Sequence, residues 1–133
     1  MPIVQFARNY QEAAIKTATP GQLVLMLFDG ALRAMATALA GFQIEAVGPR
    51  MEQINNQIIK AQAILRELKA SLDVRTGGEF AGRMWGLYDF MIDRLGAANL
   101  AKEPEPIRIA ENFLRDIRDA WAAMLEKSTT EAA

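Results

Sequence analysis

Few residues of this chain have the types and spacing that chemistry requires. Asp89 and Asp93 stand four positions apart, so on a helix their carboxylates could share a metal ion or a proton. Arg94 follows Asp93 directly, and a solvated, charged helix face is the interpretation we favour for this group. The 133 residues include no cysteine and no histidine, which excludes thiol catalysis, thiolate metal sites and the Glu-x-x-His pairs of di-metal bundles. We expect a protein that is not an enzyme and that holds no metal ion or cofactor.

The sequence also offers little for binding phosphates or nucleic acids. Gly77-Gly78 is too short for a phosphate-cradling loop and is better interpreted as the entry to a helix. Four aromatic residues lie beside expected core positions and are not interleaved with a basic patch: Trp85, Tyr88, Phe90 and Trp121. With 15 basic and 16 acidic side chains the formal net charge is −1, which predicts no bulk attraction to nucleic acid or to an anionic membrane.

Helix signals divide the chain into a lead segment and four long stretches. Thr19-Pro20-Gly21-Gln22 has a threonine N-cap, a proline at the first helical position and a glutamine three residues after the cap, and its helix should reach about Phe42. Further helices should begin near Gly48-Pro49, after a cap signature at Thr76-Gly77-Gly78-Glu79, and after the proline-rich turn at residues 102–106. No run alternates convincingly with the period of a strand.

Four helices joined by short loops predict an all-α fold, an antiparallel up-down four-helix bundle over residues 19–127. Residues 1–18 would form a lead segment or short helix, and residues 128–133 a frayed tail. Apolar residues in the last three helices recur at steps of three and four, which is the period of bundle helices. In the second helix this stripe is Met51, Ile54, Ile58, Ala61, Leu65, Leu68 and Leu72.

The first long helix is apolar on nearly every side. One stripe contains Val24, Phe28, Ala31, Met35, Ala38 and Phe42, and a second contains Leu25, Leu32, Ala36 and Leu39. Asp29 and Arg33 are the only charges between Gly21 and Ile44, and their i, i+4 spacing is that of an ion pair. This pair at the centre argues against insertion into a membrane. Four helices of this length cannot cover one member completely, so we expect a partner for this helix.

Several covers for the second stripe are compatible with the residues. It could pack under the lead segment, which offers Phe6, Tyr10 and Ile15, or against a second copy of the chain. A removable lead segment could also protect a groove until a ligand displaces it. The hydroxyl of Tyr10 could stay in water while its ring is buried, which suits a reversible contact.

The order of motifs resembles the FliS-type flagellar secretion chaperones of bacteria. The similarity begins with residues 10–23 (YQEAAIKTATPGQL) and Met26-Leu27-Phe28-Asp29-Gly30-Ala31. It continues through residues 60–65 (KAQAIL), Ser71-Leu72-Asp73, Gly77-Gly78-Glu79, residues 87–91 (LYDFM) and Asp119-Ala120-Trp121. Phe28 and Phe90 stand where the family usually has tyrosine, which puts only a hydrogen bond at each site in question.

The resemblance implies a cytoplasmic bundle that binds the C-terminal helical segment of flagellin, prevents its premature polymerisation and delivers it to the type III export apparatus. It also implies that Tyr10 and Ile15 belong to a segment that either covers a groove or docks on an export gate component. For the partner face we select Leu25, Leu32 and Leu39, with Ile58 and Leu65 nearby. We expect a monomer or weak homodimer. The alternatives are a structural homodimeric bundle and a carrier of a small apolar ligand.

Overall fold

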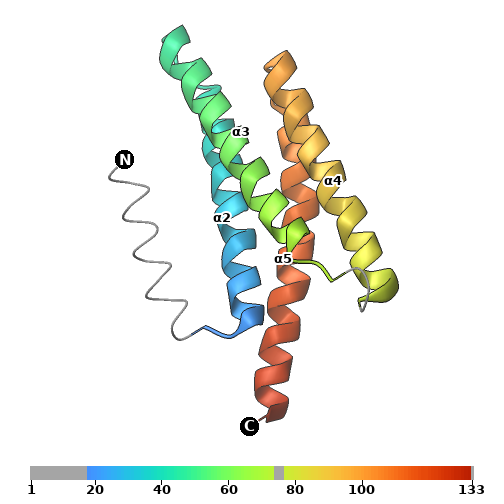
Figure 1. The fold of residues 1–133 in the computed structure, drawn as a ribbon. Helices are drawn as coiled ribbons and strands as arrows, with labels where there is room; N and C mark the ends of the chain where they lie inside the picture. Colours follow the sequence, from blue (N-terminus) through green and yellow to red (C-terminus); the bar gives the residue numbers. More distant parts are fainter. Residues whose placement is uncertain (1–17, 74–76, 133) are drawn as a thin grey trace.

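The computed structural model describes residues 18–73 and 77–132, with side chains up to Ser128, and these residues form four α-helices (Figure 1). They are α2 (Pro20–Gly41), α3 (Val47–Ala70), α4 (Gly78–Ala101) and α5 (Glu105–Ala132). No strand occurs in the described part of the chain. The predicted all-α fold class is therefore confirmed.

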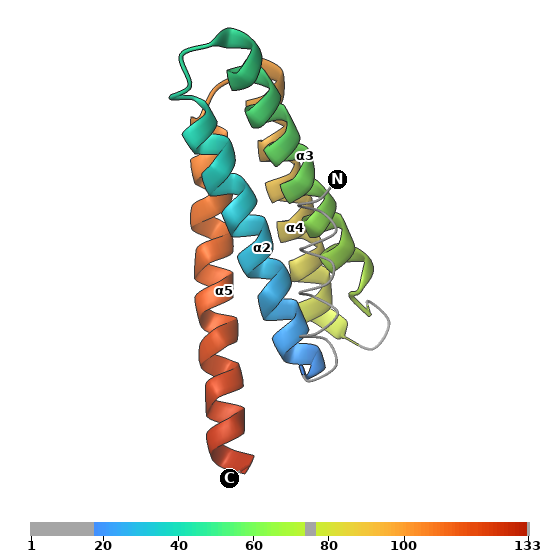
Figure 2. The same cartoon turned by 90° about the vertical axis from the view of Figure 1, so that its left-hand side faces the viewer.

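The helices form an antiparallel bundle in which each packs against its neighbours in the sequence and α5 returns to pack against α2. Figure 2 shows α2 and α5 side by side, with the C-terminal part of α5 extending past the start of α2. The loops after α2, α3 and α4 are too short for a crossover connection, so consecutive helices must run in opposite directions.

Local signals at the helix ends explain where these elements begin. The hydroxyl of Thr19 accepts a hydrogen bond from the Gln22 amide (3.2 Å), and the Gln22 side chain accepts one from the Thr19 amide (3.0 Å). This is the predicted capping box at the start of α2. The start of α4 differs from the prediction, because its N-cap is Gly77, which makes no side-chain cap. Thr76, the cap we predicted there, lies outside the described residues.

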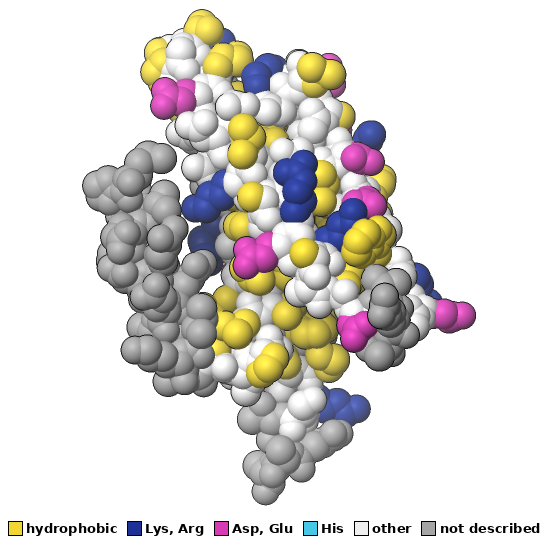
Figure 3. All heavy atoms as spheres, viewed as in Figure 1, with side chains coloured by type: hydrophobic (Ala, Val, Ile, Leu, Met, Phe, Trp, Pro, Cys, Tyr) yellow, Lys and Arg dark blue, Asp and Glu magenta, His cyan; other side chains and the backbone are white. Residues whose placement is uncertain are grey.

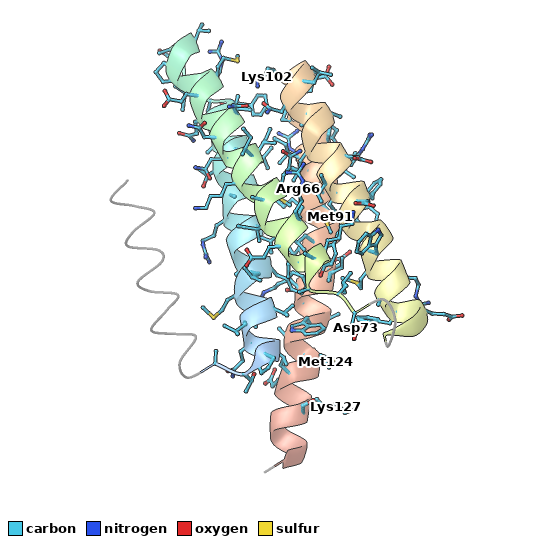
Figure 4. The ribbon with its side chains drawn as sticks, viewed as in Figure 1. Arg66, Asp73, Met91, Lys102, Met124 and Lys127 are labelled. Atoms are coloured by element: carbon cyan, nitrogen blue, oxygen red, sulfur yellow. The ribbon has the colours of Figure 1, made fainter. Side chains whose placement is uncertain are left out.

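The last helix is longer than predicted. Helical backbone continues to Ala132, through most of the segment for which the sequence predicts a frayed tail. Figure 4 labels Met124 and Lys127 on α5, just before this extension.

The core consists of the predicted apolar stripes. Fully buried positions on α3 to α5 include Ile54, Ile58, Leu65, Leu68, Met91, Leu95, Ile107 and Leu114. On α2, the stripe that contains Phe28, Ala31, Met35 and Ala38 faces the core, and Ala34 and Gly41 are buried with it. The core-facing surface of α2 is thus broad, because α3 packs on one side of this stripe and α5 on the other.

Amide side chains of α3 fix its register against both neighbours. Gln53 Nε2 donates to the carbonyl of Thr37 on α2 (2.9 Å), and Gln62 Nε2 donates to the carbonyl of Ile92 on α4 (3.1 Å). Asn99 on α4 donates to Asn55 on α3 (2.8 Å). Because each bond requires one axial position, these contacts select a single alignment of apolar stripes that could otherwise slide by a turn.

Candidate partner-binding site

The second apolar stripe of α2 lies on the flank that faces α5. Leu25, Leu32 and Leu39 are half-buried there. Two contacts show that this flank of α2 faces α5. Asp29 bonds to Arg118 of α5, and a Cβ added at Gly21 would lie 2.6 Å from a methyl of Leu125. We refer to Leu25, Leu32 and Leu39 as the leucine stripe.

The three leucines of the stripe differ in whether they pack against the core. Leu32 and Leu39 pack against the buried cluster, whereas Leu25 is not among the described residues that do so. Leu25 is therefore the member of the stripe that a partner could contact with the least effect on the core.

The ion pair beside this stripe differs from the one that spacing suggested. Asp29 Oδ1 bonds to Arg118 Nε at 2.8 Å, instead of pairing with Arg33 on its own helix. Position 29 points toward α5, where a planar guanidinium can reach it, while Arg33 is exposed to solvent. The hydrogen bond that Arg118 donates to Asp29, and then the negative charge of Asp29, raise the pKa of Arg118 above its ordinary value.

By length and composition alone, α2 is long and apolar enough to cross a membrane, a test that the core helix of a soluble protein also passes. Here a charge at the middle of the helix is paired with a neighbouring helix of the same bundle. That arrangement accounts for the acidic residue at the centre of an apolar helix.

Ile58 and Leu65, which the sequence placed near the partner face, have 0% of their surface exposed. Both belong to the core cluster between α3 and the other helices. They present no surface to a partner in this conformation, because their stripe is the only one with which α3 can fill the core. Tyr10 and Ile15 lie outside the described residues.

An apolar pocket of about 260 Å³ opens at the end of the bundle where α2 and α4 begin and α3 ends. All four helices contribute to its walls, which include Val24, Phe28, Leu68, Leu72, Phe80, Met84 and Trp121. Figure 3 shows hydrophobic side chains gathered on this lower part of the molecule, and Figure 4 places Asp73 just after α3 at the same end. We refer to it as the end pocket.

Trp121 holds one wall of the end pocket in place. Its indole nitrogen donates to the carbonyl of Gly21 (2.8 Å), and its ring packs edge-on against Phe28 with the centroids 6.1 Å apart. Tyr88 of α4 also lines the pocket, and only 3% of its surface is exposed. Burial raises the pKa of Tyr88 to about 12.

Sequence reasoning missed the end pocket although it identified several of its residues. Phe28 and Leu68 stand on predicted core stripes, and Trp121 was predicted to lie beside core positions. Periodicity says which face of a helix is apolar, but it does not say where helices begin or end beside a longer neighbour and leave the stripe uncovered. The signal that was present is the large size of the residues near the ends of these stripes.

The acidic pair considered for chemistry lies on a charged outer face. Asp89 forms a salt bridge with Lys69 of α3 (2.5 Å), and the same ammonium lies 4.2 Å from the centre of the exposed ring of Trp85. The described residues contain no cluster of three or more acidic side chains that could hold a metal ion. The arrangement supports helix packing and has no geometry for acid–base chemistry.

The fold defines a helical-bundle protein with an apolar pocket at one end. Comparison with known proteins makes the class specific. The family model described as Flagellar protein FliS matches residues 4–128, and the chain belongs to this family. FliS proteins are chaperones and not enzymes, as the resemblance of the sequence implied.

Named relatives agree over most of the chain. The flagellar secretion chaperone FliS of Salmonella typhimurium is 36% identical over 127 residues, which cover 96% of this chain and 92% of the relative. That of Bacillus subtilis is 34% identical over 117 residues (88% and 84%), and that of Escherichia coli 32% over 120 residues (90% and 86%).

Proposed function

We propose that this protein is a cytoplasmic export chaperone that binds the C-terminal helical segment of flagellin, prevents its premature polymerisation and delivers it to the flagellar type III export apparatus. Membership of the FliS family and relatives named flagellar secretion chaperones support a role in flagellar export. The leucine stripe is the observation that carries the binding role.

The physical reason is the match between the stripe and an amphipathic helix. Leucines seven residues apart stand in a row along one flank of α2, which suits a helix laid lengthwise on the bundle. A segment that is disordered before binding and helical afterwards would lose chain entropy and gain apolar burial on such a surface. The bound segment could not then pack against another flagellin.

Calorimetric titration with a peptide that covers the C-terminal segment of flagellin from the same organism tests the proposal. We expect saturable binding with a negative heat-capacity change, because apolar surface is buried. Absence of heat and of co-elution at micromolar concentrations would contradict it.

Two alternative functions of the apolar surface would give different results with the same purified protein. A homodimer that buries the stripe would sediment as a concentration-dependent dimer, whereas we propose a monomer or weak homodimer. A carrier of a small apolar ligand would retain that ligand in native mass spectrometry.

For the lead segment we propose that Tyr10 and Ile15 either cover the groove or dock on an export gate component. Replacing both by alanine in the full chain distinguishes the two roles. Tighter binding of the flagellin peptide supports a cover, and weaker binding of the loaded chaperone to the gate component supports docking.

A further inference from the structure

The hydroxyl of Tyr88 is an unused hydrogen-bond donor at the end pocket. Only 3% of the Tyr88 side chain is exposed, and it lines the pocket. It makes no hydrogen bond to any residue that the structure describes. Within that part of the chain, no fully buried side-chain oxygen or nitrogen lacks a partner. The hydroxyl oxygen must therefore keep contact with open space, and the space that this side chain lines is the pocket.

The pocket suits one apolar side chain accompanied by one hydrogen-bond acceptor. Its walls are aliphatic and aromatic, so an apolar occupant gains from burial there. A volume of about 260 Å³ is several times the roughly 30 Å³ share of one water and lies below the roughly 300–1,000 Å³ of pockets for drug-sized ligands. A hydroxyl that leaves water without a partner is costly, so the occupant must offer it an acceptor.

The position of the pocket indicates which part of a client reaches it. Val24 lines the pocket, and Leu25, the next residue, begins the leucine stripe. A client helix that lies along the stripe therefore has one end beside the pocket. Carbonyls within a helix are already paired, whereas the last four carbonyls of a helix have no partner inside it.

We infer that the end pocket anchors one large apolar side chain at the C-terminal end of the client helix. The Tyr88 hydroxyl donates to a free backbone carbonyl at that end. This inference rests on the proposed function, since it names where the flagellin segment stops following α2. It assigns the hydroxyl of Tyr88 to client binding, while the ring of Tyr88 belongs to the buried core of the bundle.

Two substitutions test the anchor in the full chain with the flagellin peptide as the probe. Tyr88→Phe removes the donor and keeps the ring, so we expect affinity to fall about 3- to 10-fold, the value of one hydrogen bond. Its melting temperature should stay the same or rise, because an unpaired hydroxyl leaves the interior. Val24→Trp fills the pocket and should lower affinity by more than about 10-fold.

Val47→Trp is the matched control for the filled pocket. Val47 is 62% exposed at the first residue of α3, away from the end pocket, so this substitution should leave affinity unchanged. Circular dichroism of each variant verifies that the bundle is intact.

The outcomes separate this inference from the proposed function. If the wild-type chain binds the peptide and both Tyr88→Phe and Val24→Trp bind it equally well, the anchor is overturned and the proposed function stands. If the wild-type chain does not bind, both fail. Isotope-filtered nuclear Overhauser spectra should show peptide methyl groups near the rings of Tyr88 and Trp121. Contacts at saturation that come only from the chain's own residues would overturn the anchor.

Discussion

Among single residues, Leu25 separates partner binding from stability most clearly. Because it is half-buried and lies outside the group that packs against the core, Leu25→Asp should change the free energy of unfolding by less than about 1 kcal/mol. The same substitution places a charge on the leucine stripe and should lower affinity for the flagellin peptide by more than about 10-fold. Urea unfolding and calorimetry measure the two effects.

Leu100→Asp provides the control for that change. Leu100 is 91% exposed in the last turn of α4, so a carboxylate there should leave binding unchanged and lower stability by less than about 1 kcal/mol. Equal affinity of the Leu25→Asp variant and the wild-type chain would remove Leu25 from the partner face.

Tyr88 predicts how stability depends on pH at the alkaline end. Burial raises its pKa from 10.0 to about 12 in the folded protein, so the unfolded chain releases this proton first as pH rises. The unfolded state then binds fewer protons between about pH 10 and 12, and stability falls through that window by about 2–3 kcal/mol. Below pH 10 both states are neutral at this residue and the contribution is constant.

Comparison with Tyr88→Phe isolates this effect from the lysines that titrate in the same range. The difference in unfolding free energy between wild type and variant should decrease from pH 10 to pH 12, as followed by urea titration at each pH. A difference that is flat with pH would show that the Tyr88 proton is lost equally easily in both states.

Glycines within the helices differ in what surrounds them. At Gly86 on α4 an added Cβ would meet nothing within 4 Å, so Gly86→Ala should stabilise the protein by about 0.5–1 kcal/mol through the unfolded chain and helix propensity. At Gly41, the last residue of α2, the Cβ would lie 3.1 Å from Ile54 Cγ1 and 3.4 Å from the Ile54 amide nitrogen. The tighter contact is to the side chain of Ile54, which is fully buried and has little room to move, so Gly41→Ala should destabilise by about 1–3 kcal/mol. Thermal unfolding of the two variants should give opposite signs, and a shared sign would contradict the packing described between α2 and α3.

At the scale of whole helices, the buried face was predicted best for a helix with one apolar stripe and otherwise polar residues. The stripe from Ile54 to Leu68 on α3 is buried as predicted, because a helix with one apolar face has one way to enter a core. On α2 two stripes compete, and spacing alone did not decide between them. Packing decided it, since Phe28 and Met35 meet the core while Leu25 lies outside the group that packs against it.

Contacts between distant helices were beyond the sequence for a different reason. Asp29 finds Arg118 across 89 positions and Gln62 finds Ile92 across 30, whereas a pattern within one helix reports only on neighbours three or four residues away. The predicted pair of Asp29 with Arg33 was wrong because a partner on a packed helix can be closer than one on the same helix. The end pocket could not be predicted from periodicity for the same reason, because residues from four different helices line it.

The charge distribution of the whole molecule leads to a final prediction about what drives binding. The formal net charge is −1, and the proposed contact surfaces, the leucine stripe and the end pocket, are apolar. Salt screens exposed charges, with a Debye length of about 10 Å at 0.1 M and about 3 Å at 1 M, but it leaves apolar burial nearly unchanged. We therefore expect the Kd for the flagellin peptide to change by less than about 3-fold between 0.05 and 0.5 M sodium chloride. Sulfate at equal ionic strength should tighten binding, because it strengthens apolar association. A 10-fold loss of affinity with sodium chloride would instead assign recognition to ion pairs at the rim of the surface, and the leucine stripe would no longer explain why the client binds.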